Sequence, residues 1–234
     1  MWFKSATIVR TLPFAIYILF LALNNSLALL LSLVIQDIRW IYGVRVGVVA
    51  LILAWFWRQY SELSHLNQSS IAIKSTLNLQ SYAISLAVGV MVFVAWIAPY
   101  PAWAMMSAVN EGFNPISADG QGIDIPLALT RIAGAALVVP IMEELFWRSF
   151  LMRWLQNQDF LKVNPAIVGW FAFLSTAGLF AIEHSLWLAG LLAGLAYGWL
   201  YKTQRNLWSP IIAHATTNGL LGIWVLYTAD WRYW

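Results

Sequence analysis

The chain has 234 residues, of which 61% are hydrophobic and only 10% are charged. A soluble domain carries about 25% charged residues, so this composition indicates an integral membrane protein and excludes an ordinary soluble domain. The net charge of +3 needs no nucleic-acid partner. The lack of cysteine excludes disulfides and any cysteine nucleophile or cysteine-based metal site.

Apolar runs of about the 20 residues that cross a bilayer recur along the whole chain. They predict an all-α bundle of about seven membrane helices, within a range of about six to eight, that forms one membrane domain over residues 1–234. The first run follows basic residues, as a signal peptide does, but it is too long and lacks a cleavage site, so we expect a membrane helix. The expected helices cover residues 12–35, 41–57, 81–99, 126–152, 165–184, 186–201 and 207–228.

Charge in the connections predicts the orientation, because short inner loops collect Lys and Arg. The connection over residues 100–125 has no Lys or Arg but holds Glu111, Asp119 and Asp124, which is typical of an outer segment. We therefore expect the N-terminus inside and the C-terminus outside. The inner segments then carry Lys4, Arg10, Arg58, Lys74, Arg153, Lys162, Lys202 and Arg205.

The run "PIMEELFWRSF" places two glutamates and an arginine inside the fourth span. Ionisable residues at membrane depth cost about 2.5–3.5 kcal/mol each on insertion scales, so they indicate function. Glu144 and Arg148 are four residues apart and share one helix face, where they can pair. Glu143 lies about 100° around the helix and has no cation at helical spacing. It can therefore point into a cavity and act as a general base on water.

Two further spans supply polar groups that complete the reaction. His184 follows Phe180 by four residues in "FAIEHSLW", and a histidine can hold a water or share a proton. His214 and Asn218 are four residues apart in the last span and share a face. Their N–H groups suit the stabilisation of the oxyanion that forms when water attacks a carbonyl. These residues predict a peptide-hydrolysing site without a covalent nucleophile.

Three motifs stand in order on successive apolar spans: E-E-x-x-x-R from Glu143, F-x-x-x-H from Phe180 and H-x-x-x-N from His214. They resemble the CPBP family, which comprises type II CAAX prenyl endopeptidases, bacteriocin-processing proteases and Abi-type membrane proteins. The resemblance covers about residues 126–228. The runs "LWLAGLLAGLAYGWLY" and "HATTNGLLGIWVL" also look like the CAAX-protease-related branch that accompanies bacterial exosortase systems.

The resemblance implies a hydrolase of the bacterial cytoplasmic membrane that needs no cofactor. Its partners would be membrane lipids, a peptide or protein substrate in or near the membrane, and an exosortase system. The motifs define the chemistry and not the peptide that is cut. The implied site consists of the base Glu143 with its helper His184, the oxyanion hole of His214 and Asn218, and the orienting pair Glu144 and Arg148.

Other functions fit parts of the pattern. Zn²⁺ held by Glu143, His184 and His214 is a chemically reasonable metalloprotease site, although the chain lacks H-E-x-x-H and the resemblance favours metal-free catalysis. The polar residues can also be structural, as in a scaffold or an immunity-type membrane protein. A proton-coupled transporter is a third alternative, which the lack of an inverted repeat disfavours.

The predicted spans leave the depth of the site open. Glu143 lies toward the inner side of its span and His184 near the outer end of the next, so plain spans would keep them apart. Either the fourth helix extends outward, or residues 184–190 dip back into the bilayer inside the protein. Other polar residues in or near spans form no group that suggests a reaction. We interpret them as helix contacts or interface anchors: Asn24, Asn25, Arg45 and Arg131.

Overall fold

The computed structural model describes residues 5–31, 37–63, 77–106, 112–117 and 119–234. Within these residues the chain forms helices and no strand, so the prediction of an all-α bundle is confirmed. The helices are α1 (Ala6–Ala22), α2 (Asn24–Leu31), α3 (Ile41–Phe56), α4 (Leu79–Trp96), α5 (Ile125–Ala133), α6 (Val139–Glu144), α7 (Met152–Trp154), α8 (Trp170–Ile182), α9 (Trp187–Gln204) and α10 (Trp208–Thr228).

α5, α6 and α7 follow one another without a break. Two π-helical segments, Gly134–Val138 and Leu145–Leu151, join them, so that Ile125–Trp154 is one continuous helix of 30 residues. We call it the long helix. It is about 45 Å long, well beyond the hydrocarbon core of about 30 Å. Among the described residues it is one of three helices long and apolar enough to cross a membrane, together with Ile38–Gln59 and Leu79–Trp96.

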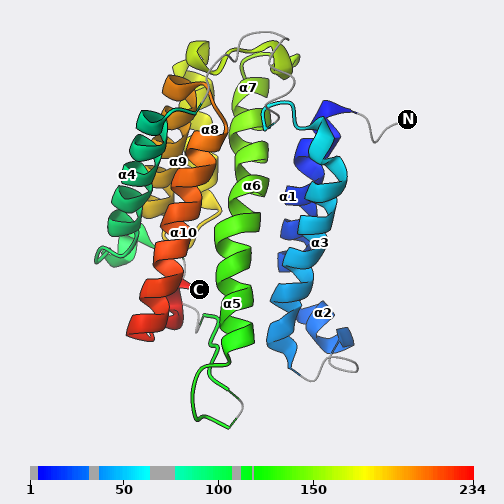
Figure 1. Cartoon of the computed structure of the whole chain (residues 1–234), viewed down its shortest axis with the longest axis vertical. Helices are drawn as coiled ribbons and strands as arrows, with labels where there is room; N and C mark the ends of the chain where they lie inside the picture. The colour runs from blue at the N-terminus through cyan, green and yellow to red at the C-terminus, as the bar shows by residue number, and fades with distance from the viewer. Residues whose placement is uncertain (1–4, 32–36, 64–76, 107–111, 118) are drawn as a thin grey trace.

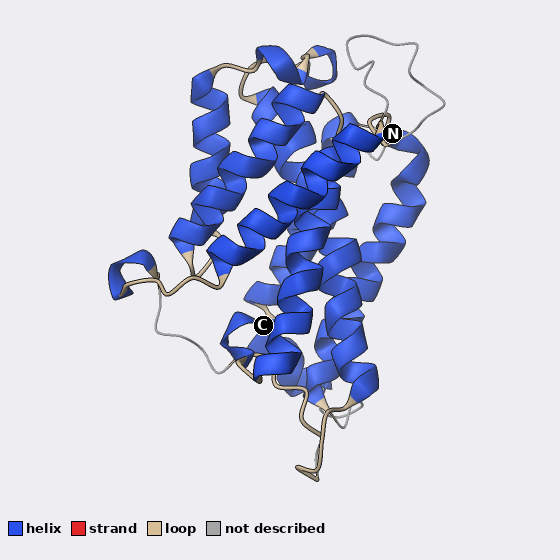
Figure 2. Cartoon of the chain, turned by 60° about the vertical axis from the view of Figure 1, so that its left-hand side comes forward, coloured by secondary structure: helices blue, strands red, loops and turns tan. Residues whose placement is uncertain are grey.

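The long helix separates two groups of helices (Figure 1). α1 packs against α3 on one side, and both contact the long helix. On the other side α10 packs against α4 and against the long helix, and α8 packs against α9 (Figure 2). The seven expected spans thus correspond to α1, α3, α4, the long helix, α8, α9 and α10.

The first predicted span is wrong at both ends. The span expected over residues 12–35 is a helix that begins at Ala6 and ends at Ala22, and the separate helix α2 follows from Asn24. The break comes directly before Asn24, because an asparagine side chain competes for backbone hydrogen bonds and disfavours a helix interior. Residues 32–36 of this span lie outside the described residues.

The fifth predicted span begins too early. The helix expected from residue 165 begins only at Trp170. Pro165 starts a separate 3₁₀ turn, Pro165–Ile167, which the Asn164 side chain caps. Gly169 then takes extended backbone (φ −71°, ψ 165°) ahead of the helix. Because a proline cannot donate to a preceding turn, the chain restarts its helix after this stretch.

A glycine lets α4 and α10 approach closely, as small residues do in membrane bundles. A Cβ on Gly89 of α4 would lie 2.5 Å from the Ala213 carbonyl oxygen and 2.7 Å from the Thr216 Cβ of α10. The Gly89 carbonyl also accepts a hydrogen bond of 2.9 Å from Thr217 Oγ1. This contact fixes the position of α10, which carries the H-x-x-x-N motif.

Gly89→Ala is therefore expected to lower the free energy of unfolding by about 1–3 kcal/mol, because the added methyl group has to push two helices apart. The measurement is equilibrium unfolding of the detergent-solubilised protein in increasing SDS. Gly47→Ala on α3 is the matched control, since a Cβ on Gly47 meets no atom within 4 Å. An equal loss of stability in both variants would contradict close packing as the cause.

A buried ionic network closes the end of the bundle where α1 begins and α7 ends. The Glu62 carboxylate accepts from Arg10 Nη2 at 2.5 Å and from Arg153 Nη2 at 2.6 Å, and the Ser149 hydroxyl also donates to it. The side chains of Arg10, Glu62 and Arg153 are only 1%, 2% and 1% exposed. Arg10 and Arg153, expected among the charges of the inner connections, are therefore buried. Three further charges of the predicted connections lie outside the described residues: Lys4, Lys74 and Glu111.

Candidate functional site

Pro140 shapes the part of the long helix that precedes the two glutamates. In the π-helical register the N–H of residue 140 would donate to the carbonyl of Ala135. Proline has no N–H, so this carbonyl lacks a donor from its own helix. Asn218 Nδ2 of α10 donates to this carbonyl at 2.8 Å. One N–H of Asn218 therefore holds α10 against the long helix, and the second amide hydrogen remains for another acceptor. Such π segments occur frequently at functional sites.

Glu144 is held from two sides. Its Oε1 accepts from Arg148 Nη1 at 3.1 Å and lies 3.0 Å from His214 Nδ1. Glu144 is fully buried and Arg148 is 2% exposed, and Arg148 also donates to the Gly194 carbonyl at 3.3 Å. The expected pair of Glu144 and Arg148 on one helix face is present, and the contact with His214 links this pair to α10. Neither Glu144 nor Arg148 lines the neighbouring cavity, so both support its wall from behind.

A cavity of about 250 Å³ lies beside Glu143. Glu143, His184, His214 and Asn218 all line it. Glu143 is 6% exposed, and its Oε2 is buried with no hydrogen-bond partner among the described residues. The structure therefore brings together, around one cavity, the four residues that the sequence analysis proposed for base, helper and oxyanion hole. Their roles stay a prediction.

Glu143 and His184 lie at the same depth because α8 is short. α8 has 13 residues, or about 20 Å, and so ends well inside a hydrocarbon core of about 30 Å. Glu143 precedes Trp154 by about eleven residues, which is about 17 Å along the long helix from the same end. Figure 1 shows α5 continuing past the end of α8. The early end of α8 thus brings His184 to the level of Glu143, and the depth of both residues in the membrane stays a prediction.

Hydrogen bonds fix which ring nitrogen of each histidine carries a hydrogen. His184 Nδ1 lies 2.7 Å from the Phe180 carbonyl oxygen. Because a carbonyl only accepts, Nδ1 carries the hydrogen, and neutral His184 keeps Nε2 as an acceptor for water. His214 Nδ1 donates to the Glu144 carboxylate in the same way. His214 can therefore donate from Nε2 only as an imidazolium, whose charge Glu144 offsets.

Aromatic rings orient both histidines. The His184 ring lies 4.6 Å from the Phe180 ring, and Trp96 meets it edge-on at 5.3 Å. His214 stacks on Tyr197 with ring centres 4.9 Å apart, and the Tyr197 hydroxyl donates to Thr217 Oγ1 at 2.7 Å. The sequence analysis did not single out Trp96 or Tyr197. Their rings come from α4 and α9, and only the small-residue run around Tyr197 gave a signal.

Glu183 is a second carboxylate on the same cavity. It directly follows the last residue of α8 and precedes His184. The sequence analysis left it without a role, although its place next to a motif histidine was a usable signal. Glu183 is therefore a competitor to Glu143 for the role of base, and an experiment has to separate them.

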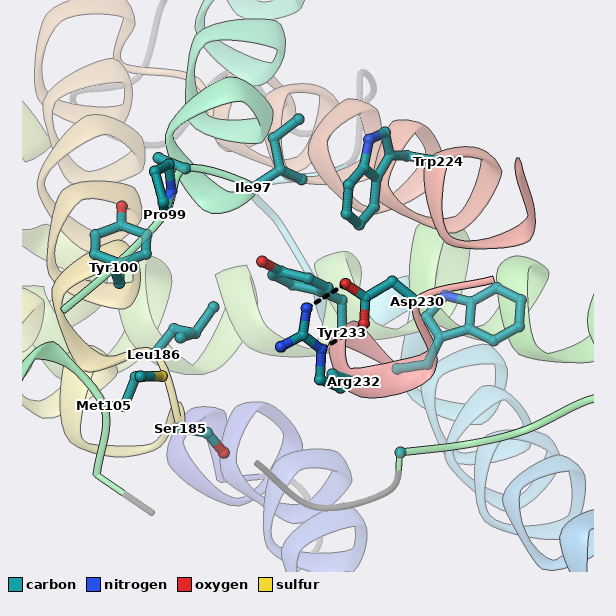
Figure 3. A pocket seen from close by; sticks show the side chains of 13 residues that line it. Ile97, Pro99, Tyr100, Met105, Ser185, Leu186, Trp224, Asp230, Arg232 and Tyr233 are labelled. Carbon is teal, nitrogen blue, oxygen red and sulfur yellow. Dashed lines mark hydrogen bonds and ion pairs between the residues drawn. The ribbon is translucent and has the colours of Figure 1, made fainter. Parts of the chain in front are cut away.

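Figure 3 shows a second cavity, of about 580 Å³, which lies near the C-terminus of the chain. The chain reverses after α10 at Ala229, which takes a left-handed conformation with φ 54°. In the turn that follows, Arg232 pairs with Asp230 at 2.5 Å. Tyr233 and Trp234 line both cavities, so they lie between the second cavity and the cavity beside Glu143.

The zinc alternative requires three ligands close together. In the part of the chain that the structure describes, no three His, Asp or Glu side chains are placed to hold a metal ion. Glu143, His184 and His214 share a cavity without forming such a group.

Residues 125–220 match the family model described as type II CAAX prenyl endopeptidase Rce1-like. The matched segment runs from the start of α5 into α10 and contains all three motifs. Over this segment the match agrees with the family resemblance of the three motifs, whereas the exosortase-associated branch stays a prediction. Neither a curated protein nor a solved structure matches the chain significantly.

Proposed function

Because residues 125–220 belong to the Rce1-like type II CAAX prenyl endopeptidase family, we propose that the protein is an intramembrane endopeptidase that uses a glutamate-activated water. One observation carries this proposal. Among the described residues, the buried Glu143 carboxylate has an oxygen without a hydrogen-bond partner, and Glu143 lines the same cavity as His184, whose Nε2 is an acceptor. A water between them can donate one hydrogen to each group.

In the proposed reaction Glu143 accepts a proton from water while the water oxygen adds to the carbonyl carbon of the peptide bond. His184 holds the second hydrogen and so orients the attacking lone pair. The protonated Glu143 then gives its proton to the amide nitrogen as the carbon–nitrogen bond breaks. The products are a carboxylic acid and an amine, and the Glu143 carboxylate is restored.

Negative charge that develops on the carbonyl oxygen needs N–H donors in a fixed position. We assign this role to His214 as an imidazolium and to the second amide hydrogen of Asn218. Glu144 offsets the charge of His214 and Arg148 orients Glu144. Asn218 is itself positioned by its bond to the Ala135 carbonyl, so the donors are held by the long helix that also carries the base.

We propose that the substrate is a peptide or protein in or near the membrane, since the cavity beside Glu143 lies between helices of apolar composition, three of which are long enough to cross a membrane within the described residues. Lipid-anchored and transmembrane substrates both meet this condition. The proposed setting is the bacterial cytoplasmic membrane, with the N-terminus inside, the C-terminus outside, and a link to an exosortase system. Membrane lipids surround the bundle, and the proposed mechanism requires no cofactor.

The test compares peptide termini in the membrane proteome of cells that carry wild-type protein with those of cells that carry Glu143→Ala at equal expression. We expect specific new termini in the wild type that are missing in the variant, and these name the substrate. Unchanged termini, together with full rescue of a deletion phenotype by Glu143→Ala, would instead indicate a scaffold. Loss of cleavage by purified protein after chelation, with recovery on adding Zn²⁺, would favour the metalloprotease alternative.

A further inference from the structure

Two arginines beside the Glu143 cavity have no acidic partner among the residues that the structure describes. Arg45 of α3 is 8% exposed, and Arg131 of α5 lines the cavity. Neither forms an ion pair within the described residues, and the Nε of each is buried without a hydrogen-bond partner. By contrast, the fully buried arginines elsewhere in the described bundle each pair with a glutamate: Arg10, Arg148 and Arg153. A buried unpaired charge is costly, so this arrangement favours an anionic partner from outside the chain.

The two guanidinium groups share one aromatic cradle. Arg45 Cζ lies 4.6 Å from the Tyr17 ring centre and 5.0 Å from that of Tyr42, and Arg131 Cζ lies 4.3 Å from that of Tyr42. Ring faces attract the cation, and stacking leaves the N–H edges of a guanidinium available for hydrogen bonds. Tyr17 and Tyr42 also line the cavity that holds Glu143. We call Arg45 and Arg131 the arginine pair.

Resting on the proposed function, we propose that the arginine pair binds a carboxylate of the peptide substrate. Arg131 precedes Glu143 on the long helix by about twelve residues, or about 18 Å along the axis between their backbones. Because both side chains line one cavity, their charged ends lie closer together than that, within the length of about five extended residues. A carboxylate held by the pair therefore places a peptide bond a few residues away at Glu143. Guanidinium groups match carboxylates with two parallel hydrogen bonds. The carboxylate is either that of the substrate C-terminus or that of an acidic side chain.

The binding experiment uses three peptides and the full-length Glu143→Gln protein in detergent, so that no peptide is cut. The peptides are acetyl-Leu-Ala-Leu-Ala-Leu as the free acid, the same peptide as the C-terminal amide, and an amide in which one alanine is glutamate. Dissociation constants are measured by isothermal titration calorimetry. We expect at least one of the two anionic peptides to bind about tenfold or more tightly than the neutral amide. Which one does so identifies the source of the carboxylate.

Variants of the arginine pair test the cause of the preference. Arg45→Met with Arg131→Met should bring the affinities of the anionic and neutral peptides to within about twofold, while the neutral amide binds as before and so reports an intact cavity. If the double variant does not fold, Arg131→Met alone should lower the preference, and Arg131→Lys should restore part of it. Arg39→Met is the matched control, because Arg39 already pairs with Asp37 and does not line the cavity.

Three results would overturn the proposal. The three peptides bind with equal affinity, or the preference for the anionic peptides survives Arg45→Met with Arg131→Met, or no peptide binds at all. A fourth such result is tight, arginine-dependent binding of dihexanoylphosphatidylglycerol without binding of the peptide acids, which would assign the pair to a lipid headgroup. Cleavage by the wild-type protein is measured separately. The proposed function can therefore stand when the carboxylate site fails, and the carboxylate site can be seen when no cleavage occurs.

Discussion

Glu143→Gln is expected to lower the rate of peptide cleavage by about 10²–10⁴-fold, the range typical of a lost general acid–base group. The amide keeps the size of the carboxylate but cannot accept a proton from water at neutral pH. Because Glu143 Oε2 has no protein partner among the described residues, the substitution breaks no hydrogen bond of that atom. Substrate binding and the free energy of unfolding should therefore change little. The measurement is kcat and KM of purified protein on a substrate identified from the membrane termini.

Glu183→Gln is the matched control for this prediction. Glu183 lines the same cavity and undergoes the same chemical change, but it lies at the end of α8 instead of on the long helix. We expect Glu183→Gln to keep most of the activity. If Glu183→Gln abolishes cleavage and Glu143→Gln does not, the base is Glu183 and the assignment of the E-E-x-x-x-R motif is wrong.

Local spacing is what made the candidate site predictable from the sequence. Glu144 and Arg148 are four residues apart on one helix, and His184 bonds the carbonyl of Phe180 four residues before it. Such pairs follow from helix geometry alone. The order of the apolar runs likewise predicted the order of the seven main helices, of which three within the described residues are long and apolar enough to cross a membrane.

Partners that are distant in the chain could not be predicted in this way. Asn218 bonds the carbonyl of Ala135, 83 residues away, because Pro140 removes a donor in a π-helical register that no periodicity indicates. Arg153 and its partner Glu62 are 91 residues apart. The charge pattern assigned Arg10 and Arg153 to connections at one common end of the bundle, where both meet Glu62. Whether they face water or a buried carboxylate depends on packing between α1, α7 and the turn after α3.

The depth of the site shows the same limit. A run of apolar residues from 165 to 184 satisfies the length of a span, but Pro165 and Gly169 shorten the helix to 13 residues. That shortening places His184 beside Glu143. The arginine pair was interpreted as helix contacts or interface anchors, because the sequence gives no sign that Arg45 is buried in the bundle or that Tyr17 and Tyr42 hold its guanidinium.

Glu62→Gln is expected to lower the free energy of unfolding by about 3–5 kcal/mol, since it leaves two buried guanidinium groups without a counter-charge. The glutamine can still accept hydrogen bonds from Arg10 and Arg153, so the loss reports charge more than hydrogen bonding. The measurement is unfolding in increasing SDS at pH 7. Asp159→Asn is the matched control: the Asp159–Lys162 pair has exposed side chains, 58% and 69%, and such pairs contribute about 0–1 kcal/mol.

The same network predicts how stability depends on pH. Burial alone would raise the pKa of Glu62, but Arg10 and Arg153 outweigh it and lower the pKa from 4.5 to about 2. The carboxylate of the folded protein therefore binds a proton less readily than that of the unfolded chain. Its contribution to stability is fully present above about pH 4.5 and is lost as the pH falls toward 2. The difference in free energy of unfolding between wild type and Glu62→Gln should be constant from pH 8 to about 5 and should shrink between about 4.5 and 2. A difference that stays constant down to about pH 2 would mean that the charge of Glu62 does not hold the two arginines in the folded protein.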